Sequence, residues 1–195
     1  MSSAGHGHGP EHGHSSPENR KVALLIAVLA LVLAFSETLG KSAQTAGLSY
    51  NIEASNLWSF FQAKTIRMTT LRTAAEQADL GLKQATDPNV KEALEQRIAA
   101  WRKIAERYES EPETQEGRKE LAARAKAAEQ KRDHALAAYH HYEVASAALQ
   151  IAIVLASAAI ITTMMWLTWV AGGLGVVGVA FCLIGFLAPT SVHLF

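Results

Sequence analysis

Hydrophobic residues along this chain gather in two long runs that a charged block separates. The first run, residues 22–35, is entirely apolar and continues as far as Leu39 with few polar interruptions. A helix needs about twenty mostly apolar residues to cross the hydrocarbon core of a bilayer. We therefore predict a transmembrane helix over residues 22–40.

The second run is long enough for two membrane-spanning helices. No Asp, Glu, Lys or Arg occurs in the last 52 residues. The Gly172-Gly173 pair favours a turn, and Trp166 and Trp169 before it are typical of helix ends at a membrane surface. The pattern predicts two further transmembrane helices, at residues 144–167 and 174–189.

The first run also has the features of a secretory signal peptide, because Arg20 and Lys21 directly precede it. However, a polar segment of about twenty residues comes before this pair, and no cleavage site with small residues at the right spacing follows the run. We expect the segment to be retained as a membrane span.

The charged block, residues 41–143, has the periodicity of packed helices. Apolar or small residues recur there at alternating steps of three and four, which is the spacing of a coiled-coil seam. The first stripe comprises Met68, Leu71, Ala75, Ala78, Leu82 and Ala85. The later stripes comprise Leu94, Ile98, Trp101, Ala105 and Tyr108, and then Leu121, Ala125, Ala128, Ala135, Tyr139 and Tyr142. Proline disfavours helical geometry in the residue before it, which predicts breaks at Asp87-Pro88 and near Pro112.

Helix lengths favour a hairpin for this block. The outgoing arm, residues 41–86, would be about 69 Å long, and the return pieces, 89–109 and 113–143, would together measure about 77 Å. We predict an all-α membrane protein with three transmembrane helices and a long antiparallel, coiled-coil-like helical hairpin between spans one and two. A compact three-helix bundle is the alternative if the outgoing arm bends at Gly40 or Gly47.

Composition narrows the expected partners. The chain of 195 residues carries 18 basic and 18 acidic side chains, so it lacks the basic excess expected of a nucleic-acid-binding protein. A lipid bilayer is the expected partner. The single cysteine, Cys182, lies in the second apolar run and is expected to serve as a small packing residue.

The N-terminal segment, residues 1–21, is rich in Gly, His, Ser and Pro and is predicted to be a disordered tail. Four of its histidines, His6, His8, His12 and His14, could bind Zn²⁺, Cu²⁺ or Ni²⁺, all of which accept imidazole ligands. A divalent metal is therefore a possible partner of the tail. The alternative is a solvated tail without a metal, because glycine-spaced histidines have no fixed geometry.

Two groups of titratable residues lie at predicted membrane boundaries. Glu37 could handle ions or protons within the membrane, or it could form an interfacial ion pair with Lys41. His140 and Glu143 are three residues apart and could share a ligand or a proton, and His141 lies beside them. The alternative for the histidines is a position in an interfacial belt of aromatic residues.

Charged residues within the stripes and a stripe of small residues both affect how the helices are expected to associate. Lys64 and Arg132 occupy positions that are otherwise apolar or small, where a charge could fix register, bind an anionic partner or extend into water. In the last predicted span, small residues repeat at steps of four and three, which allows another helix to approach closely. This stripe comprises Ala171, Gly175, Gly178, Cys182 and Gly185. We predict that it packs against helices of the same chain or of another chain.

Four segments of the chain carry a resemblance to a known family. They are residues 19–30, 40–44, 51–58 and 61–67. The sequence is similar there to an uncharacterised bacterial family described only as a domain of unknown function. The similarity extends over nearly the whole chain after the tail. This resemblance implies a bacterial membrane protein with paired C-terminal spans, and it carries over no activity, cofactor or functional residue.

The usual nucleotide, hydrolase, zinc and redox motifs are missing from the sequence. We therefore expect neither enzyme activity nor a cofactor. The leading hypothesis is a non-catalytic scaffold or structural protein that forms a homo-oligomer. The alternative is an oligomeric ion channel or transport accessory subunit that uses Glu37 or the His140/His141 region.

Two groups of basic residues near the predicted spans favour opposite orientations of the chain in the membrane. Arg20 and Lys21 precede the first span and favour a cytoplasmic N-terminus. Four basic residues precede the second span, and none lies beyond it, which favours a cytoplasmic central block. These four are Arg124, Lys126, Lys131 and Arg132. The larger bias predicts a multi-pass protein of the bacterial inner membrane with its central block in the cytoplasm.

Overall fold

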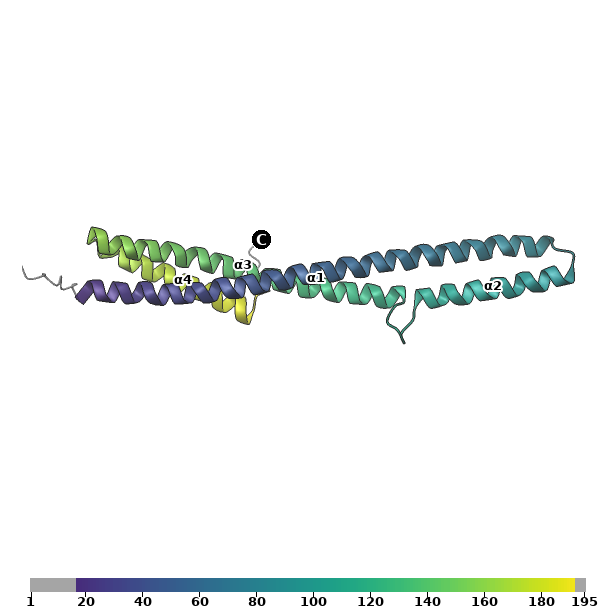
Figure 1. Ribbon diagram of the computed structural model, residues 1–195, viewed down its shortest axis with the longest axis horizontal. Coiled ribbons are helices and arrows are strands. Elements are labelled where there is room, and N and C mark those ends of the chain that lie inside the picture. The colour runs from purple at the N-terminus through teal and green to yellow at the C-terminus, as the bar shows by residue number, and fades with distance from the viewer. Residues whose placement is uncertain (1–16, 192–195) are drawn as a thin grey trace, which may run out of the picture. The chain divides into compact units, whose positions relative to one another are not determined.

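The computed structural model describes residues 17–191, and every regular element in this part of the chain is a helix (Figure 1). The helices are α1 (Pro17–Gln84), α2 (Pro88–Glu109), α3 (Arg118–Thr162) and α4 (Trp166–Leu187). Within the described residues, α1, α3 and α4 are long and apolar enough to cross a membrane, as judged from length and composition. The predicted all-α fold with three candidate membrane spans is confirmed.

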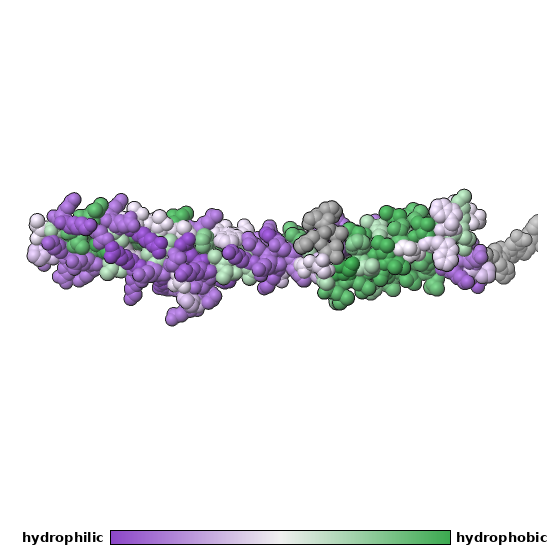
Figure 2. All heavy atoms as spheres, turned by 180° about the vertical axis from the view of Figure 1, so that it is seen from behind, coloured by the Kyte–Doolittle hydropathy of each residue, from purple (hydrophilic) through white to green (hydrophobic). Residues whose placement is uncertain are grey.

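The chain divides into two compact units, which we describe separately. Of the described residues, the span unit contains 17–41 and 138–191, and the hairpin unit contains 42–137. The surface of the span unit is mostly hydrophobic and that of the hairpin unit mostly hydrophilic (Figure 2). This contrast follows the segregation of charge in the sequence.

The two arms of the hairpin unit run antiparallel. Residues with higher numbers on α1 contact residues with lower numbers on the return arm, as in the pairs Trp58–Glu129 and Thr65–Arg118. Most of the buried residues between the arms belong to the stripes predicted from the sequence. They include Leu57, Met68 and Ala75 on α1, Ile98 and Ala105 on α2, and Leu121, Ala125, Ala128 and Ala135 on α3.

The turn between α1 and α2 forms at the predicted proline. Asp87 caps α2, because its backbone is extended and its carboxylate accepts a 2.8 Å hydrogen bond from the Asn89 amide. Pro88 occupies the first helical position, where the missing amide hydrogen costs nothing. These local preferences fix where the outgoing arm ends and the return arm begins.

The span unit is held together by apolar contacts among α1, α3 and α4. Leu29 of α1 packs with Leu149 and Ala152 of α3, and Val22 packs with Ala156 and Ala171. The described part of the chain begins inside the predicted tail, and it is already helical from Pro17. Residues 17–21 therefore belong to α1 and not to the tail.

The turn between the last two helices lies earlier than predicted. It occupies residues 163–165, while Gly172 and Gly173 lie inside α4. The prediction of a turn at the glycine pair is wrong, and so are the span boundaries at 167 and 174. Glycine is common in membrane helices, where a continuous helix satisfies the backbone hydrogen bonds that lipid cannot. The chain reverses instead at Thr163, which has a φ of 58° and falls in the left-handed region.

Candidate functional site

A cluster of charged residues surrounds the break between α2 and α3 in the hairpin unit. Lys64 of α1 is 7% exposed, although it lies in the stripe that faces the return arm. Its Nζ atom lies 3.8 Å from Glu111 Oε2 and 4.0 Å from Glu116 Oε2, and 5.1 Å from the centre of the Tyr108 ring. The break in the return arm thus supplies two carboxylates to a buried cation.

Two carboxylates at this break accept hydrogen bonds. Glu120 accepts hydrogen bonds from the Ser110 hydroxyl at 2.7 Å and from the Glu111 amide at 3.1 Å. The bond from Ser110 lowers the pKa of Glu120, and a bond from Arg107 lowers the pKa of Glu111. A side chain at Gly117 would clash, because its Cβ would lie 2.4 Å from the Glu111 backbone nitrogen.

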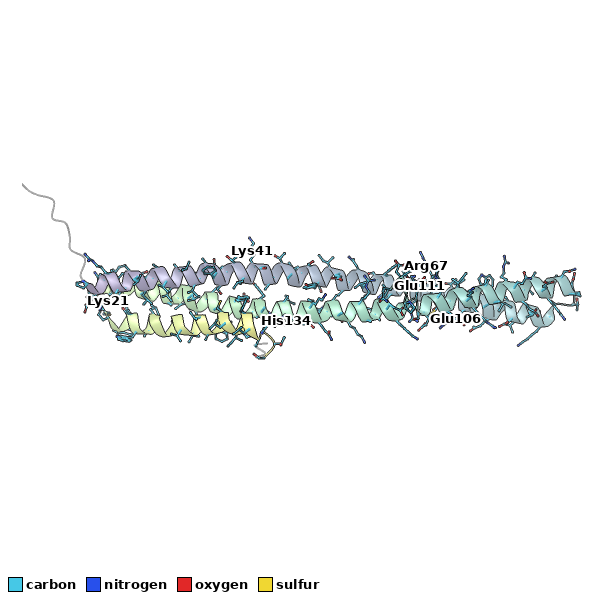
Figure 3. All side chains as sticks on the ribbon, turned by 90° about the horizontal axis from the view of Figure 1, so that it is seen from below. Lys21, Lys41, Arg67, Glu106, Glu111 and His134 are labelled. Atoms are coloured by element: carbon cyan, nitrogen blue, oxygen red, sulfur yellow. The ribbon has the colours of Figure 1, made fainter. Side chains whose placement is uncertain are left out.

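Arg118 connects the same break to α1. Its Nη1 atom lies 2.8 Å from Glu109 Oε2, and its Nε donates a 2.8 Å hydrogen bond to the Thr65 hydroxyl. The guanidinium also lies 4.9 Å from the centre of the Phe61 ring. Figure 3 labels Glu111 in this region, with Arg67 of α1 nearby. The cluster therefore joins α1 to the end of α2 and the start of α3.

The second seam cation, Arg132, has a different environment. It is half-buried and contacts Asp133 at 2.8 Å and the Asn51 side chain at 3.4 Å. Asn51 belongs to α1, so this contact also joins the two arms of the hairpin unit.

In the span unit, Glu37 lies on the exposed side of α1 and accepts a 3.2 Å hydrogen bond from Gln150 of α3. The neighbouring Ser36 is buried and donates a 3.1 Å bond to the Tyr142 carbonyl oxygen. Ser146 in turn donates to Ser36 at 3.2 Å. A short row of polar side chains therefore joins α1 to α3.

The two adjacent histidines point into different surroundings. His140 is exposed, and its Nδ1 lies 3.7 Å from Glu143 Oε2. His141 is buried, and its Nε2 lies 3.0 Å from the carbonyl oxygen of Pro189. Because a carbonyl only accepts, Nε2 must carry the proton in that bond. The structure thus brings His140 and Glu143 together and leaves His141 apart from them, packed against Phe181.

The small-residue stripe of α4 faces the other helices of the span unit. Ala171, Gly175, Gly178 and Gly185 are buried, and Cys182 is half-buried. A Cβ added at Gly175 would lie 2.6 Å from a Leu29 methyl group, and one at Gly178 would lie 2.7 Å from Leu149 Cγ. The stripe therefore packs within the chain, against α1 and α3.

The predicted metal-binding histidines, His6, His8, His12 and His14, lie outside the described residues. Among residues 17–191, no group of three or more His, Cys, Asp or Glu side chains could hold a metal ion.

The structure also shows a surface that the sequence analysis missed, which we name the outer face of α1. Its members recur at steps of four and three, none is charged, and all are exposed: Ile52, Asn56, Ser59, Ala63, Ile66, Thr70, Thr73, Gln77 and Leu80. Residues of this face line two shallow grooves. The same spacing was visible in the sequence, but most members are small or polar, so apolar periodicity did not reveal it.

A comparison with known families gives a match over residues 18–188 to the family described as a domain of unknown function, DUF4337. The chain belongs to the DUF4337 family. The predicted membership of a family described only as a domain of unknown function is confirmed. No curated protein and no solved structure matches the chain significantly. The family description assigns no activity, so the function of this DUF4337 protein has to be argued from its own surfaces.

Proposed function

We propose that this DUF4337 protein is a membrane-anchored, non-catalytic scaffold that self-associates through its hairpin unit. The observation that carries the proposal is the exposure of large apolar side chains in a unit that is otherwise highly charged. Ile52, Ile66 and Leu80 on α1 are 60–67% exposed, and Val90 and Ile104 on α2 are 47% and 41% exposed.

Exposure of this kind favours a protein partner. Burying one such side chain fully stabilises an assembly by about 1.5–3 kcal/mol. The charged cluster at Lys64 supports the same function, because it holds the two arms in fixed register and so presents a constant outer surface.

The proposal places the protein in a bacterial inner membrane with the hairpin unit in the cytoplasm. The bacterial membrane is an expectation from the family resemblance. The orientation is supported by the four basic residues that precede the second span, since basic residues accumulate on the cytoplasmic side.

Light scattering of the full chain in a mild detergent tests the proposal. We expect a protein mass of at least twice 21.0 kDa after the detergent contribution is subtracted. Adding two charges to the exposed apolar positions, with Ile66→Lys and Ile104→Lys, should lower this mass. The matched control adds two charges at exposed polar positions, with Thr86→Lys and Gln96→Lys, and should keep it. A 21.0 kDa species at all concentrations would contradict the proposal.

A second candidate function is ion or proton movement through the oligomer. The hydrogen-bonded pair of Glu37 and Gln150 favours it, because both side chains are exposed on the span unit. Flux into proteoliposomes should then fall with Glu37→Gln and stay unchanged with Glu18→Gln, which removes an exposed acid from the first turn of α1. Equal flux in both variants would eliminate this candidate.

A further inference from the structure

We infer that a second copy of this chain packs on the outer face of α1, parallel to it and in register. This inference rests on the proposed self-association and specifies its surface and direction. The inner stripe of α1 is covered by the return arm, whereas the outer face, on the opposite side of the helix, has no covering helix among the described residues.

The spacing of the outer face is that of a coiled-coil seam. The steps of four and three place Ile52, Ser59, Ile66, Thr73 and Leu80 at d positions and Asn56, Ala63, Thr70 and Gln77 at a positions. The seam extends over four heptads, about 42 Å along the helix. Four of its nine residues are apolar and would be buried by the contact: Ile52, Ala63, Ile66 and Leu80.

A second copy fits this face because the face is self-complementary. It contains no charged residue, so two identical faces meet without repulsion or an unpaired buried charge. Asn56 and Gln77 would each meet the same amide across the two-fold axis, and amides both donate and accept hydrogen bonds. An amide at an a position is known to fix register and oligomeric state in parallel dimers.

The flanking residues decide the direction. In a parallel pair, each g position faces the e position five residues later in the partner helix, so Gln62 meets Arg67 of the second copy. An antiparallel pair centred on Ile66 would instead place Arg67 against Arg67. Like charges in contact destabilise such an arrangement, which favours the parallel one.

Disulfide cross-linking of the full chain tests the inference. In a Cys182→Ser background, three variants, Ile52→Cys, Ile66→Cys and Leu80→Cys, are each treated with copper phenanthroline in native-like vesicles. We expect every one to form a covalent dimer with itself. The matched control, Lys103→Cys, replaces an exposed residue on α2 and should remain monomeric under the same conditions.

The other outcomes distinguish a failure of the parallel direction, of the inference and of the proposed function. In an antiparallel pair, only Ile66→Cys would link to itself, and Ile52→Cys would link to Leu80→Cys when these two variants are mixed. That result would overturn the parallel direction. Absence of linking in a chain that light scattering shows to be oligomeric would overturn the inference and leave the proposed function standing. A monomeric chain would overturn both.

A pair of substitutions at Gln62 tests the register without cysteines. Gln62→Glu places a carboxylate against Arg67 of the second copy, and Gln62→Lys places a like charge there. Two symmetry-related contacts should tighten the dimer about three- to fivefold in the first case and weaken it by a similar factor in the second. Equal dissociation constants for the two variants would contradict the parallel register.

Discussion

Helix α1 has two opposite faces in the hairpin unit that share one periodicity and differ in what covers them. The inner face buries Leu57, Met68 and Ala75 against the return arm, and the outer face leaves Ile52 and Ile66 more than half exposed. Alternating steps of three and four therefore identify a packing face but do not reveal whether its partner belongs to the same chain.

Placing the same charge on each face tests whether the inner and outer faces differ in their contacts. Met68→Lys would bury a cation beside Arg118 and should lower the free energy of unfolding of the hairpin unit by about 4 kcal/mol. At a dilution where the chain is monomeric, Ile66→Lys should change it by no more than about 0.5 kcal/mol, because the position is then exposed and tolerates the charge. Urea unfolding followed by circular dichroism measures both. Equal losses would mean that the two faces are not distinct.

The span unit offers a second contrast, between covered and open glycines of α4. Gly178→Leu would drive a side chain into Leu149 and should destabilise the span unit by about 3 kcal/mol. Gly173→Leu is the control, because nothing lies within 4 Å of the Cβ position there. Thermal unfolding in detergent should show a loss for Gly178→Leu only. A similar loss for both would show that the stripe does not pack within the chain.

The covered face also contains a charge, and its pairing can be tested. Lys64→Met keeps much of the apolar stem but removes the cation that Glu111 and Glu116 face, and it should cost about 2 kcal/mol. Lys103→Met changes an exposed lysine of α2 and should cost less than about 0.5 kcal/mol. If urea unfolding finds Lys64→Met as stable as the unaltered chain, the cluster does not hold the arms.

The smallest expected effect is a dependence on pH. The pKa values of Glu111 and Glu120 lie below their usual value of 4.5 in the folded protein. Their contribution to stability is therefore complete above about pH 4.5 and is lost as the pH falls through the lowered values. The urea midpoint should decrease between pH 5 and pH 3, and Ser110→Ala should reduce that decrease by removing a hydrogen bond to Glu120. An unchanged pH profile for this variant would contradict the assigned cause.

Much of the fold was predictable from the sequence because strong local preferences determine it. Apolar length predicted the spans, and Pro88 predicted the first turn. The turn at Thr163 was missed, because glycine usually marks turns in water, whereas Gly172 and Gly173 remain helical in an apolar segment. No comparable sequence pattern predicts a threonine with a left-handed backbone conformation just before a helix.

The sites were less predictable than the fold. The sequence identified Lys64 as an irregularity, but only the structure brings Glu111 to it across the hairpin. His140 and His141 are adjacent in sequence, yet consecutive residues of a helix point in different directions, which separates them. Metal binding by the tail stays a prediction, since its histidines lie outside the described residues.

We propose that a second copy of the chain covers the outer face of α1. Light scattering of the full chain in mild detergent, compared with Ile66→Lys, tests it most directly. We expect a mass of at least 42 kDa, twice 21.0 kDa, for the unaltered chain, and a shift toward 21.0 kDa for the variant with unchanged helix content. The same mass for both chains, or 21.0 kDa for the unaltered chain, would contradict it.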